Sequence, residues 1–299
     1  VENEYAVPEG ADYLKIVPEL EKNLGSSDTI IRENSLEILW KWANQGILTN
    51  AELIALGDRM ATNLTYKLGE SETDSVFLRA FSALILNGVL QTDIQFIEGK
   101  LEGRKPFLNS ELINKWFKLS LEYFIGEQDL RGYIPIKEWA HSIAHCSDLF
   151  RGFALHPLVG KEDLIKILET IAAKLIQPAN NVFTASEEAR MCRAIAGIQT
   201  RCLVLPEEYQ KWLEKIITPY AEKKWFEDFD NPEIRNQKLN ARVNARLFLH
   251  RFHNMLQYNI EDIVETQKEL FNNISQYRTS LLDMIDEGFK KMSKSNIYG

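Results

Sequence analysis

Residues 28–44 read Asp28-Thr-Ile-Ile-Arg-Glu-Asn-Ser-Leu-Glu-Ile-Leu-Trp-Lys-Trp-Ala-Asn44, and this stretch indicates the fold class. Its apolar side chains recur at the spacing of an amphipathic helix and form one stripe. Asp28 stands just before that stripe, where a residue that caps a helix N-terminus is expected. We therefore predict a helix over 28–45 whose buried stripe consists of Ile31, Leu36, Leu39, Trp40 and Ala43.

The next segment repeats this pattern after a short connection. Residues 50–69 carry Leu53, Leu56, Met60 and Leu64 at helical spacing, and only Gln45–Thr49 separate the two segments. A connection this short places consecutive helices side by side and antiparallel. The first two helices therefore predict an antiparallel pair.

Helical periodicity continues along almost the whole chain, and no alternating segment is long enough to predict a strand convincingly. The predicted class is all-α. The expected helices span residues 11–24, 28–45, 50–69, 73–90, 92–103, 109–126, 135–151, 161–177, 186–202, 206–219, 232–257 and 260–291.

A weak repeat accompanies the helices, in which an acid at a helix start is followed about one turn later by Arg. The acids at 28 and 74 lie 46 residues apart, and those at 188 and 230 lie 42 apart. HEAT and armadillo units have periods of roughly 40–47 residues. We predict an α-α superhelix of stacked antiparallel pairs, with residues 1–299 as a single helical-repeat domain and helix 260–291 closing the stack. The pairs are Asp28 and Arg32, Asp74 and Arg79, Glu188 and Arg193, and Asp230 and Arg235.

The charge argues against nucleic acid as a partner. The chain holds 43 Asp and Glu against 35 Lys and Arg, a net charge of −8, and no run of Lys or Arg exceeds two residues. Nucleic-acid binders normally carry a basic stripe that neutralises phosphates. Hydrophobic residues make up 45% of the chain, so extensive disorder is not expected either.

Cysteine usage and hydropathy predict a cytoplasmic protein. Cys146, Cys192 and Cys202 are widely spaced, form no Cys-x-x-Cys motif, and are expected to be reduced thiols. No stretch approaches the ~20 apolar residues of a membrane span. Residues 1–10 lack the apolar core of a signal peptide. We expect no membrane partner.

Residues 126–157 form the one segment with a chemical character. On the predicted helix 135–151, His141, His145 and Asp148 fall within about 60° of one another, away from the main apolar stripe. Three readings remain open: a buried hydrogen-bond network, a site for a small molecule or anion, and a metal site. Ser142 follows His141, so the zincin motif, which needs Glu there, is absent. No metal or cofactor is expected.

Asp129 and Arg131 flank a turn at Gly132 and form either a loop salt bridge or an anion site, because the guanidinium fork suits carboxylate and phosphate. No nucleophile or phosphate-binding motif occurs, so no catalytic residue is predicted. The candidate ligand-binding residues are Asp129, Arg131, Trp139, His141, His145 and Asp148.

Four blocks of the sequence carry a resemblance to a known family: Asp74–Ser82, Glu127–Tyr133, Trp139–Asp148 and Asn240–Asn244. They resemble the signature of a bacterial family catalogued as domain of unknown function 2785 (DUF2785). The resemblance covers about residues 24–256 and implies a HEAT-like α-α superhelix, but no activity. The family usually has Gly-Ala before the Asp of its Trp-Ala-His block. Cys146-Ser147 stands there in this chain, which puts any role for that glycine in doubt.

Two functions are compatible with these observations. The favoured one is a binding scaffold for a protein partner, with a polar groove formed by the His, Asp and Arg cluster, because solenoid proteins present extended contact surfaces. The alternative is an enzyme or a sensor that acts on a small anionic ligand, possibly with a metal, at the His141 and His145 cluster. An open pocket at these side chains favours chemistry, whereas apolar groups packed over them favour a structural network. The sequence predicts no oligomeric state.

Overall fold

The computed structural model describes residues 5–221, 230–258 and 268–294, and it is mostly helical, at 70%. The expected helical class is confirmed. Among the described residues, the helices are α1 (Tyr13–Asn23), α2 (Thr29–Asn44), α3 (Asn50–Asn63), α4 (Ser75–Ile97), α5 (Ser110–Gly126), α6 (Ser142–Leu155), α7 (Lys161–Ile176), α8 (Glu187–Thr200), α9 (Pro206–Ala221), α10 (Pro232–Tyr258) and α12 (Lys268–Lys294). A small hairpin consists of β1 (Tyr133–Ile134) and β2 (Glu138–Trp139).

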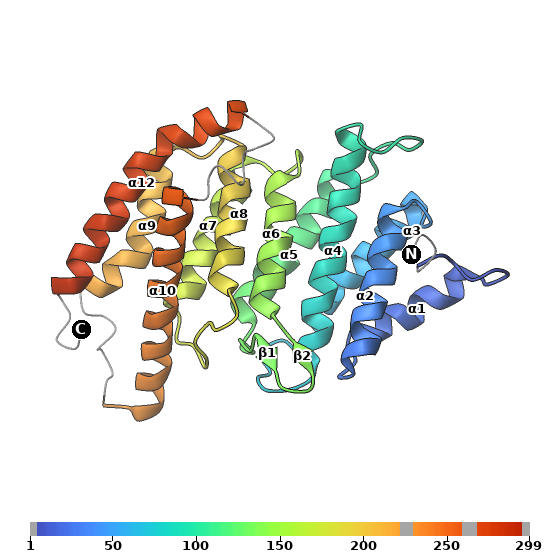
Figure 1. Ribbon diagram of the computed structural model, residues 1–299, viewed down its shortest axis with the longest axis horizontal. Coiled ribbons are helices and arrows are strands. Elements are labelled where there is room, and N and C mark those ends of the chain that lie inside the picture. Colours follow the sequence, from blue (N-terminus) through green and yellow to red (C-terminus); the bar gives the residue numbers. More distant parts are fainter. Residues whose placement is uncertain (1–4, 222–229, 259–267, 295–299) are drawn as a thin grey trace. The chain divides into compact units, whose positions relative to one another are not determined.

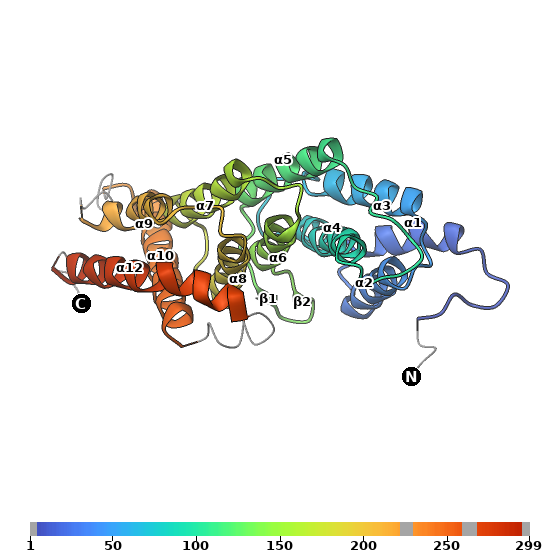
Figure 2. The same cartoon turned by 90° about the horizontal axis from the view of Figure 1, so that it is seen from above.

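The chain divides into two compact units, an N-terminal unit Val1–Leu158 and a C-terminal unit Val159–Gly299. In the N-terminal unit α1 packs on α2, α3 on α4 and α5 on α6. Helix α4 also contacts α2 and α6, and these three lie side by side in Figure 1. Figure 2 shows α3 and α5 together in a second layer. The unit is thus built from paired helices around α4.

In the C-terminal unit, α9 packs against α7 and α12, and α10 packs against α7, α8 and α12. The predicted terminal helix began at residue 260. Helix α12 is described from Lys268, and residues 260–267 lie outside the described residues. The superhelix and the single continuous domain stay predictions.

Local capping explains where the early helices begin. The Asp28 carboxylate accepts hydrogen bonds from the backbone N–H groups of Ile30 and Ile31 at the start of α2. Helix α3 begins with a reciprocal capping box between Thr49 and Glu52. These bonds satisfy N–H groups that have no partner within the helix. The predicted starts at 28 and 50 therefore agree with the structure to within one residue.

The predicted buried stripe was right for α3 and partly wrong for α2. Leu53, Leu56, Met60 and Leu64 are all fully buried. On α2 the buried residues are Arg32, Ser35, Leu39, Trp42 and Ala43, whereas Ile31 is exposed and Trp40 is half-buried. The face differs because Trp42 donates its indole N–H to the Tyr5 carbonyl oxygen at 2.7 Å and Arg32 packs over two Phe rings.

Helix α4 replaces the two helices predicted over 73–90 and 92–103. It runs without a break from Ser75 to Ile97, so the predicted interruption at residue 91 was wrong. Asp93, polar and near the predicted break, is fully buried and accepts hydrogen bonds from the backbone N–H groups of Phe107 and Leu108. Its other oxygen lies 3.1 Å from Nε2 of buried His156. Tertiary partners therefore allow a carboxylate inside a core helix.

Helix α4 also qualifies the expectation about membrane spans. Among the described helices it alone is long and apolar enough to cross a membrane, with a mean hydropathy of 1.3 in its most apolar window. Within the protein, 78% of that window is buried. The central helix of a globular core has the same length and composition, and α4 contacts helices on several sides. We treat α4 as a core helix.

Candidate functional site

The β1–β2 hairpin stands where the sequence predicted the first turns of helix 135–151. Tyr133 pairs with Trp139 and Ile134 with Glu138, and α6 begins only at Ser142. The predicted helix start was wrong because this segment leaves the helical region of backbone space. Ile136, Glu138 and His141 have φ values of 72°, 59° and 50°. Pro135 also lacks the N–H group of a helix interior.

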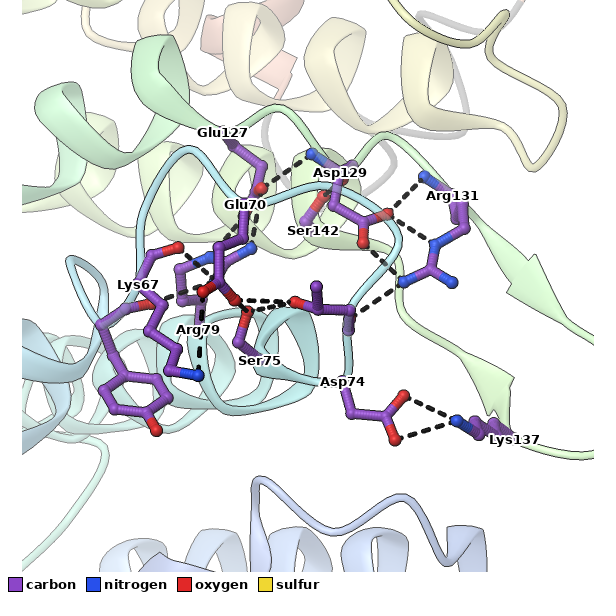
Figure 3. Close-up of polar contacts among 12 residues, drawn as sticks. Lys67, Glu70, Asp74, Ser75, Arg79, Glu127, Asp129, Arg131, Lys137 and Ser142 are labelled. Atoms are coloured by element: carbon purple, nitrogen blue, oxygen red, sulfur yellow. Dashed lines mark hydrogen bonds and ion pairs between the residues drawn. The ribbon is translucent and has the colours of Figure 1, made fainter.

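The base of the hairpin is held by the ion pair between Asp129 and Arg131, shown in Figure 3. The Arg131 guanidinium donates two hydrogen bonds to the Asp129 carboxylate, at 2.8 and 2.5 Å. It also donates to the Thr73 carbonyl oxygen at 3.0 Å, just before α4. The hydrogen bonds that Arg131 donates to Asp129 raise the pKa of Arg131. The pair is therefore a clamp between the hairpin and α4.

A fully buried ion pair supports this clamp from the interior of the protein. Arg79 on α4 donates to both carboxylate oxygens of Glu127, at 2.7 and 2.9 Å, and both side chains are inaccessible to solvent. Glu127 in turn accepts a hydrogen bond from the backbone N–H of Asp129 at 2.9 Å. Burial raises the pKa of Glu127, and the bonds from Arg79 oppose that rise. Figure 3 shows Glu127, Asp129 and Arg131 in one continuous network.

The tip of the hairpin is attached to α2 and α4. Arg32 donates to the Lys137 carbonyl oxygen at 2.6 Å, and Thr29 donates to the Glu138 carboxylate at 3.0 Å. The Lys137 ammonium pairs with Asp74 at 2.8 Å (Figure 3). The acid–Arg repeat thus has a structural role at its first two occurrences. Arg32 reaches the hairpin, and Arg79 reaches the segment before it.

Arg32 is buried and forms no direct ion pair with any residue that the structure describes. Its guanidinium carbon lies 4.0 Å from the ring centre of Phe77 and 4.9 Å from that of Phe81, and it donates to the Ser26 carbonyl oxygen. Aromatic faces attract cations, and this attraction is strongest where water is excluded. Burial lowers the pKa of Arg32, while nearby carboxylates act in the opposite direction.

A series of stacked rings runs from the hairpin into the core. Trp139 stacks on His141, with ring centres 4.5 Å apart and planes 22° apart. His141 meets His145 edge to face at 5.6 Å, and His145 meets Phe81 edge to face at 5.5 Å. Tyr133 also meets Trp139 edge to face, with ring centres 5.1 Å apart. The series of rings therefore runs from exposed Trp139 on the hairpin to buried His145 and Phe81 in the core.

The predicted site residues divide into the Asp129–Arg131 clamp and the ring series of Trp139, His141 and His145. The two groups join through the backbone, because His141 N–H donates to the Arg131 carbonyl oxygen at 3.2 Å. The side chain of Arg131 is directed to Asp129 and Thr73. His141 does not lie within a helix as predicted, because it is the residue with a left-handed backbone directly before α6. Their role in ligand binding stays a prediction.

Asp148 lies on α6, three residues after His145, and is half-buried. Metal binding finds no geometric support here. Within the described ranges, no group of three or more His, Cys, Asp or Glu side chains is placed to hold a metal ion.

The hairpin and the start of α2 expose a group of large apolar side chains, of which only Trp139 was a candidate site residue from the sequence. Ile136 is 93% exposed, Tyr133 54% and Trp139 41%. Ile30 and Ile31, 68% and 44% exposed, belong to the turn of α2 that holds the hairpin through Thr29 and Arg32. Apolar side chains gathered on a surface mark interaction sites more often than scattered ones. We call Ile30, Ile31, Tyr133, Ile136 and Trp139 the hairpin surface.

The run Tyr133-Ile-Pro-Ile136 was the available sequence signal for this surface. It follows Gly132, and apolar residues beside Gly and Pro in a turn have little core to enter. The helical interpretation of 135–151 concealed it, because a helix would have placed Ile136 on the buried stripe.

A groove of about 730 Å³ lies in the same unit, between α1, α3 and the start of α4. Several of its charged side chains are already paired with one another or with neighbours. Arg59 donates to Glu21 at 2.6 and 2.8 Å, and Asp58 accepts from Lys115 at 2.8 Å. An incoming ligand would compete with these bonds, so the groove is the weaker candidate site.

Comparison with known proteins gives one match. A family model described as "Protein of unknown function (DUF2785)" matches residues 64–254. Neither the curated proteins nor the solved structures contain a match. The matched range includes the hairpin and the Arg79–Glu127 ion pair. It begins directly after α3, so α2 lies outside it.

Proposed function

The chain belongs to the DUF2785 family of proteins of unknown function, and we propose that it is a binding scaffold that contacts a protein partner through the hairpin surface. One observation carries the proposal: an apolar hairpin tip is exposed and yet firmly attached. Its backbone and side chains bond to Thr29, Arg32 and Asp74, and its base is clamped by Arg131. Rigid apolar anchors lose little entropy on binding.

Backbone strain at the tip supports the same function. Ile136 is β-branched and has a φ of 72°, a conformation that costs roughly 1–2 kcal/mol for a side chain with a Cβ atom. Strained residues cluster at functional sites and persist where surrounding contacts hold them in place. In this strained conformation the Ile136 side chain is 93% exposed, so it contributes nothing to the core.

A HEAT-like superhelix is the architecture that we propose for this scaffold. The paired helices of the N-terminal unit and the acid–Arg repeat support it, because repeat proteins stack such pairs and use their surfaces to bind partners.

The alternative function, an enzyme or a sensor for a small anionic ligand, has less support. The Arg131 guanidinium already binds Asp129 and the Thr73 carbonyl group, and His145 is buried against Phe81. A ligand at this place would have to displace internal bonds. We expect no thermal shift with phosphate or simple carboxylates.

The scaffold function is tested by site-specific photo-crosslinking in cells. A photoreactive amino acid replaces Ile136 in one variant and exposed Lys118 on α5 in the control. We expect a discrete adduct only from position 136. The partner is then identified by mass spectrometry, purified, and titrated against wild type and the Ile136→Ser variant.

An Ile136→Ser substitution should weaken the purified complex roughly tenfold or more, as expected for a contact at the centre of an interface. Adducts of equal yield from positions 118 and 136, or unchanged affinity in Ile136→Ser, would exclude the hairpin surface as the binding site.

A further inference from the structure

We propose that the hairpin surface binds a basic amphipathic protein segment, in which Lys or Arg side chains lie beside apolar ones. This inference rests on the proposed function and specifies the chemistry of the partner. It follows from the carboxylates that border the apolar side chains and from the scarcity of outward-facing cations between them.

The carboxylates come from three parts of the N-terminal unit. Glu33 and Glu37 follow Ile30 and Ile31 on α2, and Glu138 is part of the hairpin itself. Further acids stand before the two helices that hold the hairpin: Asp28, Glu72 and Asp74.

Three of these acids act on one another. Burial raises the pKa of Glu33, and repulsion from Glu138 and Glu37 adds to the rise, against the attraction of Arg32. Within the described part of the chain, no Lys or Arg forms an ion pair with Glu33, Glu37 or Glu138. An incoming cation would therefore meet carboxylates that repel Glu33 and that form no direct ion pair with a described Lys or Arg.

The cations of the same region already have partners within the protein. Arg32 is fully buried and bound to carbonyl oxygens, Arg131 is bound to Asp129, and Lys137 is bound to Asp74. The outward field of this surface is thus set by its acids. Opposite charge on a partner accelerates encounter and excludes partners of like charge.

The same charge argues against the other surfaces that an exposed Trp, Tyr and Ile group could contact. Anionic lipid headgroups and nucleic-acid phosphates would be repelled by Glu33, Glu37 and Glu138. A basic amphipathic protein segment matches both the apolar side chains and the charge of this surface. Its apolar side chains would cover Ile136, while its cations would reach the surrounding carboxylates.

Three fluorescent peptides test the inference on the full-length protein. The first is helical with Leu on one face and Lys on the other, the second has Glu in place of every Lys, and the third has Ser in place of every Leu. We expect the Leu–Lys peptide to bind most tightly by fluorescence anisotropy, with the other two weaker by roughly tenfold or more. Anionic vesicles containing phosphatidylserine are assayed in parallel.

Two sets of variants separate the apolar and the charged contributions. Ile30→Ser with Ile136→Ser removes exposed anchors at unchanged charge, and should weaken the Leu–Lys peptide about tenfold. Glu33→Gln with Glu37→Gln and Glu138→Gln should weaken it about three- to tenfold and flatten its salt dependence. The matched control is Glu111→Gln with Glu122→Gln on the exposed face of α5. Circular dichroism melting curves confirm that each variant is folded.

The inference is overturned if the Leu–Glu peptide binds as tightly as the Leu–Lys peptide, if the α5 control weakens binding equally, or if the vesicles bind preferentially. Its failure is distinguishable from failure of the scaffold function. A partner that is crosslinked from position 136 and tolerates the neutralisation of all three glutamates would leave the scaffold intact and refute the basic partner. Absence of a specific adduct at 136 would refute both.

Discussion

Arg79 and Glu127 show how a single buried pair supports an exposed surface. Both are inaccessible to solvent, and Glu127 also holds the backbone of Asp129, from which the Arg131 clamp extends. From the sequence, Arg131 was predicted to form a loop salt bridge or an anion site, and Arg79 was noted only as part of the acid–Arg repeat. In the structure Arg79 is the fully buried cation, while Arg131 remains partly exposed.

Loss of Arg79 should therefore be severe. Arg79→Leu leaves the Glu127 carboxylate buried without its cation, which should lower the free energy of unfolding by about 3–5 kcal/mol. Lys137→Ala, which breaks the exposed pair with Asp74, should change it by no more than about 1 kcal/mol. Urea denaturation followed by circular dichroism measures both.

A double-mutant cycle decides whether the pair acts as a unit. Arg79→Leu and Glu127→Leu should be strongly non-additive, because each one alone leaves an uncompensated charge. A coupling energy below about 0.5 kcal/mol would contradict the pairing seen in the structure.

Glu187 on α8 is expected to make the stability of the protein depend on pH. The residue is buried, and burial raises its pKa, although a backbone N–H from Ala185 donates to its carboxylate at 2.9 Å. A raised pKa means that the folded state holds the proton more tightly than the unfolded state. The resulting stabilisation is complete below the unfolded pKa of about 4.3 and is lost as the pH rises through the folded pKa.

The variant Glu187→Gln should remove this dependence. It should have a higher melting temperature than wild type at neutral pH, and the difference should shrink as the pH falls to about 4. Melting temperatures measured at intervals between these limits test the prediction, with exposed Glu162→Gln on α7 as control. Parallel curves for wild type and Glu187→Gln would show that the buried carboxylate is not responsible.

At the scale of elements, the hairpin is the part of the fold in which local preference and observed structure disagree. Ile136, Glu138 and His141 all have positive φ, and none of them is Gly. Contacts to α2 and α4 hold this conformation. Helix α6, which follows the hairpin, packs closely against α4 at Gly152. A Cβ atom at this position would lie 2.2 Å from Oδ1 of Asn87 on α4.

Substitution of Ile136 by Gly should stabilise the protein and weaken its binding to a partner. Gly adopts positive φ without strain, so the free energy of unfolding should rise by up to about 1 kcal/mol. Partner binding should weaken at the same time, because the exposed anchor is lost. The matched Ile134→Gly change, at a half-buried strand position without positive φ, should destabilise the protein by about 1 kcal/mol. Thermal unfolding that ranks the two variants in the opposite order would refute a strained tip.

At the scale of the whole molecule, charge is the property that bears most directly on partners. A net charge of −8 and the absence of basic runs predict no tight binding of DNA or RNA. Gel shifts at low and at physiological salt, with random duplex and single-stranded probes, should show no complex at micromolar protein. A salt-sensitive complex would mean that the fold assembles a basic surface from isolated residues.

The family range and the compact units do not share boundaries. The family model covers residues 64–254, whereas the contacts divide the chain after Leu158. Each unit therefore contributes helices to the region that defines the family, α4 to α6 from one and α7 to α10 from the other.

The helical class and most helix positions followed from the sequence alone. Periodicity and capping are properties of residues a few positions apart, so Asp28, Thr49 and the Leu53–Leu64 stripe were sufficient to place α2 and α3. The resemblance to the DUF2785 family was also readable from local blocks such as Trp139–Asp148, and the family match confirms it. The candidate segment 126–157 could also be located from the sequence, because its histidines stand close together along the chain.

The hairpin and its anchors were decided only by tertiary structure. Arg79 meets Glu127 across 48 positions and Arg32 meets Lys137 across 105, and a periodic pattern carries no information about such partners. These distant hydrogen bonds and ion pairs stabilise a strained turn where local propensity favoured a helix. The surface that we propose as functional, centred on Ile136, is exposed because contacts remote in the sequence outweigh the preference of its own residues.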